Sequence, residues 1–311
     1  MTAAQIRVKD VSRTFRLGSE DIHALRGVSL NVEPREFLAL VGRSGSGKTT
    51  LMNIIAGLDR PSTGEVWVDE MRLDQLGEKD LTKLRRGQFG FIFQSFGLLP
   101  LLSAQENVEL PMRIAGYGHG ERVRRAKAAL DAVGLNRRSH HRPYELSGGE
   151  QQRVAIARAI ATEPRLILAD EPTGELDSTT AKAVFTLLRT LAREHSFTVV
   201  TCTHDRLVME MADRVEELVD GQIVTSEHSV VWKRAQEQER SPFEAAFVGA
   251  KHGGEEAAGG LSSLVGADSA VFIRPKLDRQ ASRSAATAGE DGHDAPSSDE
   301  ASLWARPDRK E

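Results

Sequence analysis

The stretch of sequence that decides the fold is Gly42-Arg43-Ser44-Gly45-Ser46-Gly47-Lys48-Thr49. It fits the pattern G-x-x-x-x-G-K-[ST], in which glycines let the backbone curl so that successive N–H groups point at phosphate oxygens. The Lys48 ammonium is suited to the β- and γ-phosphates of a nucleotide, and the Thr49 hydroxyl is suited to Mg²⁺. The residues predicted to hold the nucleotide here are Gly42, Ser44, Gly45, Ser46, Gly47, Lys48, Thr49 and Thr50.

The sequence on both sides of this loop supports the same interpretation. Residues 37–41 form a short apolar run that is typical of a buried strand. Residues 50–56 are typical of a helix that begins at about Lys48 and is capped by Gly57. The N-terminus of such a helix attracts anions. Strand, loop and helix therefore follow in the order that a phosphate-binding loop requires.

A second glycine-bearing stretch lies far downstream, at Leu146-Ser147-Gly148-Gly149-Glu150-Gln151-Gln152-Arg153. After it, the apolar run 166–169 ends in Asp170-Glu171-Pro172-Thr173. Carboxylates at the end of a central parallel strand lie where ligands bind. Asp170 is therefore expected near Mg²⁺, and Glu171 is expected to act as general base on a water in line with the γ-phosphate. Two different phosphate-binding stretches, residues 42–49 and 146–153, suggest a nucleotide held between two copies of the chain.

Together these residues resemble the ATP-binding cassette of ABC transporters, over approximately residues 6–227. Other landmarks of that family follow in the family order. They are Phe15 as the adenine-stacking aromatic, Gln94 as the Q-loop glutamine, Leu146–Arg153 as the signature, 166–173 as the Walker B strand, 174–177 as the D-loop, and 203–205 as the H-loop. The signature is close to diagnostic, because other phosphate-loop ATPases lack it.

The resemblance implies an ATPase in which two cassettes pair head to tail around ATP. The signature of one copy would close over the γ-phosphate bound to the other, with the following helix, residues 150–161, contributing its positive end. The implied catalytic residues are Glu171, His204 and Gln94. The implied nucleotide contacts outside the phosphate loop are Phe15, Ser147, Gly148, Gly149 and Asp177. The implied Mg²⁺ site consists of Thr49, Gln94 and Asp170.

Two positions depart from the family pattern. Glu175 stands in the D-loop where this kind of cassette usually carries Asn, which could alter coupling between the two sites. Phe15 replaces the commoner Tyr, and a ring without the hydroxyl should still stack on adenine.

The fold class expected is α/β: a phosphate-loop cassette with a RecA-like parallel-sheet core, a small antiparallel β layer and an α-helical subdomain. The ATP-binding domain is expected over residues 1–228, with the helical subdomain at about 95–163. Antiparallel strands are predicted over 6–15, 23–32 and 65–68, and a closing hairpin turns at Asp220-Gly221. Residues 229–311 are rich in Ala, Ser, Gly and mixed charge, which predicts a largely disordered extension.

Composition narrows the function further. The 311 residues carry a net charge of −4 with no polybasic footprint, so nucleic-acid binding is not expected. The single Cys202 excludes an internal disulfide framework and suits the cytoplasm. No run of 18 apolar residues exists, so the chain is not expected to span a membrane. A transporter cassette of this kind needs separate permease chains, which places it in the cytoplasm, peripheral at the inner face of the cell membrane.

Stretches 57–61, 93–100, 106–111 and 169–174 resemble the LolD/MacB-like branch, which handles lipoproteins or macrolides. That branch implies an FtsX/MacB-like integral membrane permease, with Phe96, Leu98 and Leu99 lining the groove for its coupling helix. The alternative is an FtsE-like ATPase that signals through a membrane partner without moving cargo. A soluble cassette of DNA repair or translation is weakest, because the chain has neither a long coiled-coil insertion nor a second cassette. The substrate would be chosen by the permease.

Overall fold

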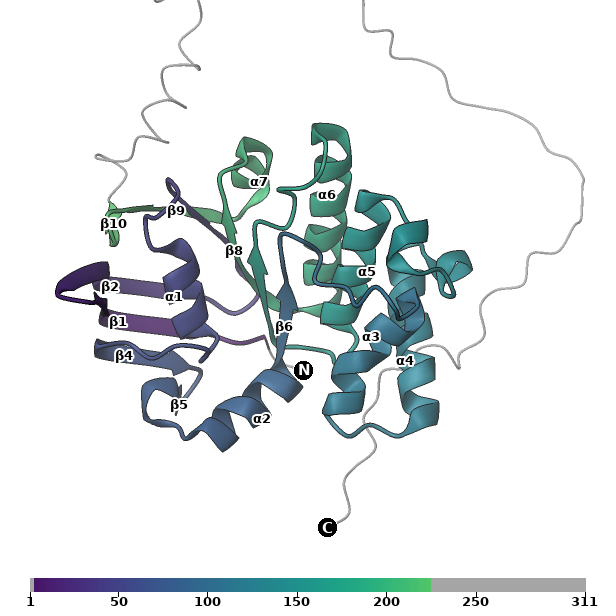
Figure 1. Cartoon of the computed structure of the whole chain (residues 1–311), viewed down its shortest axis with the longest axis horizontal. Helices are drawn as coiled ribbons and strands as arrows, with labels where there is room; N and C mark the ends of the chain where they lie inside the picture. The colour runs from purple at the N-terminus through teal and green to yellow at the C-terminus, as the bar shows by residue number, and fades with distance from the viewer. Residues whose placement is uncertain (1–2, 225–311) are drawn as a thin grey trace, which may run out of the picture. The chain divides into compact units, whose positions relative to one another are not determined.

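Two sheets of different kinds organise residues 3–224, the part of the chain that the computed structural model describes (Figure 1). The smaller sheet is antiparallel, in the order β2-β1-β4-β5. Its strands are β1 (Ile6–Leu17), β2 (Glu20–Val32), β4 (Thr63–Val68) and β5 (Met71–Arg72). In β1, buried Ile6 and Val8 alternate with exposed Arg7 and Lys9, because only one face of the sheet packs on the core. The antiparallel layer predicted from alternation is thus present, with β1 and β2 longer than expected.

The larger sheet has the order β10-β9-β3-β8-β7-β6. Strands β3, β6, β7, β8 and β9 pair in parallel, and β10 pairs antiparallel with β9 across the Asp220-Gly221 turn. Both turn residues have positive φ, as the predicted hairpin requires. The strands are β3 (Phe37–Val41), β6 (Phe89–Ile92), β7 (Leu166–Asp170), β8 (Thr198–Thr203), β9 (Arg214–Val219) and β10 (Gln222–Val224). Every residue of β3 and β8 is buried, which is typical of parallel strands covered on both faces.

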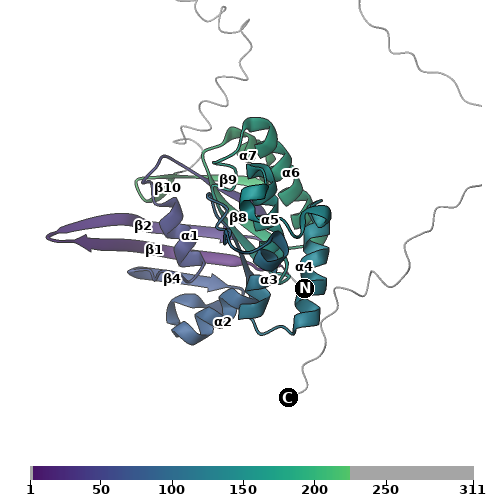
Figure 2. The same cartoon turned by 45° about the vertical axis from the view of Figure 1, so that its right-hand side comes forward.

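Helices separate into those around the sheets and a group between β6 and β7 (Figures 1 and 2). The helices are α1 (Lys48–Ile55), α2 (Glu78–Gln88), α3 (Ala104–Ile114), α4 (His119–Ala132), α5 (Gly148–Ile160), α6 (Ser178–His195) and α7 (Arg206–Met211), with 3₁₀ turns at Leu73–Gln75, Asn136–Arg138 and Pro143–Glu145. Helices α3, α4 and α5 fall within the helical subdomain predicted over 95–163. Helix α5 begins two residues before the predicted start, because Ser147 caps it.

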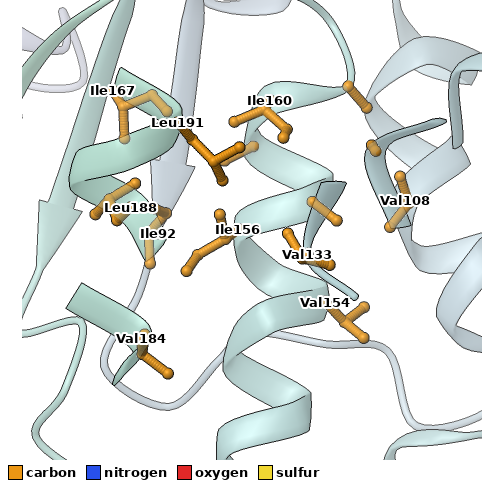
Figure 3. Packing of buried hydrophobic residues seen from close by; sticks show 14 of the residues in the cluster. Ile92, Val108, Val133, Val154, Ile156, Ile160, Ile167, Val184, Leu188 and Leu191 are labelled. Atoms are coloured by element: carbon orange, nitrogen blue, oxygen red, sulfur yellow. The ribbon is translucent and has the colours of Figure 1, made fainter. Parts of the chain in front are cut away.

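A continuous apolar core joins this helical group to the parallel sheet. Figure 3 shows Ile156 of α5 among Ile92 of β6 and Leu188 of α6. All three side chains are buried, at 0–1% exposure. Burying an aliphatic side chain of this size stabilises the fold by about 1.5–3 kcal/mol. The core therefore holds α5 against the strands whose ends carry the functional residues.

A buried cation lies inside the helical group. The Arg125 side chain, on α4, is 1% exposed, with its Nε 3.0 Å from Glu121 Oε1 and its Nη1 2.7 Å from Glu163 Oε1. The guanidinium also lies over the Tyr117 ring, 5.2 Å from its centroid. Glu163 follows α5 in the chain, so this ion cluster joins α4 to the segment that leads into β7.

Some expectations fall outside the described residues. The disordered extension over 229–311 and the domain boundary at 228 lie beyond residue 224. Within 3–224, no helix is long and apolar enough to cross a bilayer. Cys202 is fully buried on β8, where it packs against Met52.

Candidate nucleotide-binding site

Four parallel strands deliver the predicted residues to one edge of the larger sheet. The phosphate loop follows β3, Gln94 follows β6, Asp170 ends β7, and His204 follows β8. Because β3, β8, β7 and β6 are adjacent and parallel, their carboxyl ends meet at the same edge. Residues separated by more than a hundred positions in the sequence therefore converge on one site.

The phosphate loop has a backbone that only glycine fits at two positions. Gly42 has φ 149° and Gly47 has φ 104°. A Cβ at Gly42 would overlap the carbonyl oxygen of Leu218, and one at Gly47 would lie 2.5 Å from the carbonyl oxygen of Ala24. The neighbouring strands thus hold the loop closely, and α1 begins directly after it without a side-chain cap. Its first N–H groups remain suited to an anion.

Lys48 is 8% exposed and points back into the loop. Its Nζ donates to the carbonyl oxygens of Gly42 at 2.9 Å and Arg43 at 3.0 Å. The ammonium therefore lies at the centre of the curled backbone, where a phosphate group would also lie.

Two oxygen donors face each other between the phosphate loop and β7. Thr49 Oγ1 donates to Asp170 Oδ2 at 3.4 Å. Burial raises the pKa of Asp170, while the Thr49 hydroxyl opposes that shift. A half-buried carboxylate beside a hydroxyl is a donor set that suits a hard divalent cation such as Mg²⁺. The residues present therefore fit the metal that the phosphate loop implies.

Glu171 and His204 form a pair beside these donors. Glu171 Oε1 lies 3.2 Å from His204 Nδ1, with the Glu171 side chain 24% and the His204 side chain 71% exposed. Glu171 has φ 44°, a strained conformation for a residue with a Cβ, which its N–H bond to the Cys202 carbonyl at 2.9 Å helps to hold. The backbone conformation of Glu171 thus helps to determine the direction of its carboxylate.

Gln94 reaches the loop that follows Glu171. A Cβ at Gly174 would lie 3.1 Å from Gln94 Nε2, so the amide rests directly on the Gly174 backbone. The Q-loop and the segment after β7, which the sequence only predicted to be near each other, are in contact.

The signature forms the start of α5 in a specific way. Ser147 Oγ accepts from the Glu150 N–H, and a Glu150 carboxylate oxygen accepts from the Ser147 N–H at 2.9 Å. This capping box lowers the pKa of Glu150, chiefly through the hydrogen bond from the Ser147 backbone. Gly148 and Gly149 then form the first helical residues, whose N–H groups have no partner within an α-helix.

The signature is also fastened to the segment after β7 in its own chain. Gln152 is fully buried, and its Nε2 donates to the Pro172 carbonyl oxygen at 2.5 Å. A Cβ at Gly149 would lie 2.5 Å from Thr180 Cγ2, so α5 and α6 approach closely there. The signature is therefore in direct contact with the loop that follows Glu171.

Within one chain the phosphate loop and the signature lead into helices with different neighbours. Helix α1 contacts β1, β2, β4 and β8, whereas α5 contacts α3, α4, α6 and β6. Figure 1 shows α1 beside the antiparallel sheet and α5 in the helical group. The phosphate loop and the signature of one chain are thus attached to helices that pack on different elements.

Two other predicted nucleotide contacts have distinct surroundings. Phe15 is 39% exposed near the end of β1, with Arg13 beside it. Asp177 is exposed, and its Oδ1 accepts from the N–H groups of Thr179 and Thr180 at 3.1 Å. That carboxylate caps α6, and its pKa is lowered, chiefly by a hydrogen bond with the Thr180 side chain and then by the backbone bonds of the cap.

A hollow of about 250 Å³ lies beside the Q-loop. Its lining includes Phe93, Ile114 and Arg158, with Phe93 45% and Ile114 51% exposed. The groove residues expected from the sequence do not line it. Leu98 packs against the core, and the Phe96 carbonyl accepts from Arg158 at 2.8 Å. The hollow is lined instead by residues in and around α2, β6, α3 and α5.

Sequence reasoning missed several contacts of the site. It assigned no individual role to Arg13, Asp59, Gln152 or Gly174. Arg13 lies over Phe15, Asp59 bonds Arg13, Gln152 bonds the Pro172 carbonyl, and Gly174 lies against Gln94. Gln152 carried a signal, since it is a polar residue beside the apolar run that starts at Val154. Arg13 also carried one, because residues two apart on a strand share a face.

Comparison with known proteins identifies the family. A family model described as ABC transporter matches residues 25–174. The ATP-binding cassette MJ0796 of Methanocaldococcus jannaschii is 46% identical over 226 residues, covering 71% of this chain and 96% of that protein. The macrolide export ATP-binding/permease protein MacB of Wolinella succinogenes is 50% identical over 238 residues, covering 76% of this chain. The chain spans 36% of the length of that MacB.

Solved structures agree. The dimeric structure of MJ0796, and a dimeric post-hydrolysis state of it bound to ADP and Pi, each match with a TM-score of 0.66 at 46% and 45% identity. Each covers 71% of this chain and 97% of the solved chain. The resemblance inferred from the motifs, the α/β fold and the ATPase class are all confirmed by these matches. The chain belongs to the ABC transporter family, as an ATP-binding cassette.

Proposed function

We propose that this chain is the ATP-hydrolysing subunit of an ABC transporter and drives a separate FtsX/MacB-like permease from the inner face of the cell membrane. The name of the MacB relatives, ATP-binding/permease protein, supports a permease as the partner. In this proposal residues 1–228 form the ATP-binding domain, and 229–311 form an extension to it. Handling of a lipoprotein or another extracytoplasmic substrate would be determined by the permease.

The observation that carries the proposal is the placement of the phosphate loop and the signature beside helices with different neighbours. The phosphate-loop helix α1 and the signature helix α5 of one chain pack on different elements, which supports a site completed by the signature of a second copy. The solved relative MJ0796 is a dimer, which supports a head-to-tail pair here. Ser147, Gly148 and Gly149 of one copy would then cover the γ-phosphate on the other.

Binding of ATP would change the contacts of Lys48. Its Nζ now donates to loop carbonyls, and phosphate oxygens are stronger acceptors for an ammonium. Thr49 and Asp170 would hold Mg²⁺, with Gln94 as a further oxygen donor. When bound, this ion would neutralise charge on the phosphates.

Hydrolysis would depend on positioning and electrostatics. Glu171 is placed to accept a proton from the attacking water, because its carboxylate lies at the carboxyl end of β7 and its backbone is held by β8. His204 would hydrogen-bond the γ-phosphate once ATP is present, and its contact with Glu171 keeps both groups together until then. Phe15 would stack on adenine.

The permease would contact the hollow beside the Q-loop. Phe93 and Ile114 expose apolar surface there, and the Arg158 guanidinium lies at the same place. An amphipathic helix presents such apolar residues at helical spacing. Gln94 directly follows Phe93, so helix docking and the Mg²⁺ site would be linked through one residue step.

The test compares wild type with Glu171→Gln by light scattering on a sizing column, with and without Mg-ATP. The variant should stop hydrolysing and remain as an ATP-bound dimer, because binding is retained and the base is lost. Glu194→Gln makes the same chemical change at an exposed position of α6 and should behave as wild type. Hydrolysis by Glu171→Gln at the wild-type rate would show that Glu171 is not the base. Monomers throughout, with ATP bound, would contradict the head-to-tail pair.

A further inference from the structure

A guanidinium group covers one face of the Phe15 ring. Arg13 Cζ lies 4.4 Å from the ring centroid, which is within the range of a cation–π contact. Phe15 remains 39% exposed, so a second planar group has room on the ring. The ring is therefore covered by a guanidinium on one face while part of the residue remains exposed.

Asp59 fixes the orientation of that guanidinium. Arg13 Nε donates to Asp59 Oδ2 at 2.9 Å, and Arg13 Nη2 donates to Asp59 Oδ1 at 2.8 Å. The two parallel bonds define the plane of the guanidinium as well as its position. Both side chains are about three-quarters buried, at 24% and 26% exposure, so water competes little for these bonds.

Asp59 in turn belongs to the segment that ends the phosphate-loop helix. Its N–H donates to the Asn53 carbonyl oxygen of α1 at 3.2 Å, and α1 begins at Lys48. A short chain of contacts thus runs from the phosphate loop through α1 and Asp59 to Arg13 and Phe15. This chain of contacts is one of the connections between the aromatic ring and the phosphate loop.

We propose that Arg13, clamped by Asp59, is a positioning residue that holds Phe15 where a nucleobase can stack while the triphosphate occupies the phosphate loop. This rests on the proposed function, in which Phe15 stacks on adenine. A planar guanidinium is suited to the task, because it stacks on the ring while one of its edges, Nε and Nη2, stays hydrogen-bonded to the Asp59 carboxylate. A lysine would keep the charge and lose both the stacking and the bidentate bonds.

A purely structural role makes a different prediction. The Arg13–Asp59 pair also joins β1 to the end of α1, and its loss on that account would weaken every ligand of the phosphate loop alike. Positioning of the ring, in contrast, affects only ligands that carry a base. Inorganic tripolyphosphate has the phosphates of ATP without a base and separates the two roles.

The experiment measures dissociation constants of ATP and tripolyphosphate by calorimetry on the full chain, together with KM and kcat for ATP. Arg13→Ala should raise the Kd and KM for ATP about fivefold and leave kcat and the Kd for tripolyphosphate unchanged. Arg13→Lys and Asp59→Asn should give smaller shifts in the same direction. Arg7→Ala is the matched control. Arg7 lies on the same strand as Arg13, and its Cζ lies 5.0 Å from the centroid of the Trp67 ring.

Phe15→Ala separates this inference from the proposed function. Phe15→Ala should weaken the binding of ATP and leave the binding of tripolyphosphate unchanged. Adding Arg13→Ala to Phe15→Ala should cause no further loss of ATP affinity. If Phe15→Ala does not weaken ATP, base stacking by Phe15 itself is wrong. If Phe15→Ala weakens the binding of ATP while Arg13→Ala has the same Kd for ATP as Arg7→Ala, base stacking by Phe15 is supported and the role of Arg13 is overturned. Equal weakening of ATP and tripolyphosphate by Arg13→Ala would also overturn it.

Discussion

The buried guanidinium of Arg125 offers a sharp test of how the helical group is held together. Arg125→Met keeps most of the aliphatic stem of the side chain and removes its charge. Glu121 and Glu163 then lose the cation that lies 3.0 and 2.7 Å from their carboxylates. Neither carboxylate is freely solvated, since their side chains are 25% and 15% exposed.

The size of the effect follows from that burial. Removing one partner of a fully buried ion pair costs about 3–5 kcal/mol, and the partial exposure of both carboxylates favours the lower end. For a domain of this size, about 3 kcal/mol corresponds to a fall in Tm of roughly 6–12 °C. Adding Glu163→Gln to Arg125→Met should recover part of the loss, because one of the unpaired charges is removed with it.

Differential scanning calorimetry of wild type, Arg125→Met, Arg125→Lys and the double variant measures this. Arg125→Lys should fall between wild type and Arg125→Met, because an ammonium keeps the charge without bridging both carboxylates equally. A Tm for Arg125→Met within about 1 °C of wild type would refute the argument. So would a double variant that is less stable than Arg125→Met.

Further predictions concern the site. Gly174→Ala should reduce kcat with little change in ATP affinity, because its Cβ would displace Gln94, and Gln94→Ala in a rate assay should reproduce it. Gly42→Ala should abolish nucleotide binding in calorimetry, because both the positive φ and the close carbonyl exclude a Cβ. Asp170→Asn should raise the Tm of the nucleotide-free protein in EDTA at neutral pH. Burial raises the pKa of Asp170, so its charged form destabilises the fold above that pKa, and the gain should disappear as pH falls through it towards about 4. Ile114→Glu should leave ATP binding and basal hydrolysis unchanged and abolish stimulation by the permease in a reconstituted ATPase assay.

Much of the fold could be predicted because local patterns and topology agree. The apolar runs at 37–41 and 166–169 are strands β3 and β7, and their polar ends fall on one sheet edge as parallel strands require. Gly57 and Gly134 each have a positive φ and follow a helix, as the sequence predicted from their places after apolar helical segments. The limits of β1, β2 and α5 were displaced by two or three residues, because hairpin pairing and a capping box set them.

The motif residues could be predicted, whereas their contacts could not. The pairing of Glu171 with His204, and of Arg13 with Asp59, joins residues 33 and 46 positions apart, a separation at which periodicity carries no information. Asp177 was assigned to the nucleotide by family position, and the carboxylate caps α6 because it precedes two free N–H groups. The hollow lined by Phe93 and Ile114 could not be predicted, because it is formed by side chains from segments far apart in the sequence.

The hydrogen bond from Gln152 to the Pro172 carbonyl has a consequence for stoichiometry. In the proposed pair, each chain lends its signature to its partner while that signature is tied to its own hydrolytic loop. A mixed dimer with one disabled subunit would then not retain half of the wild-type turnover. The disabled chain would act as a dominant-negative partner, and titrating it into wild-type protein would lower activity more steeply than its mole fraction.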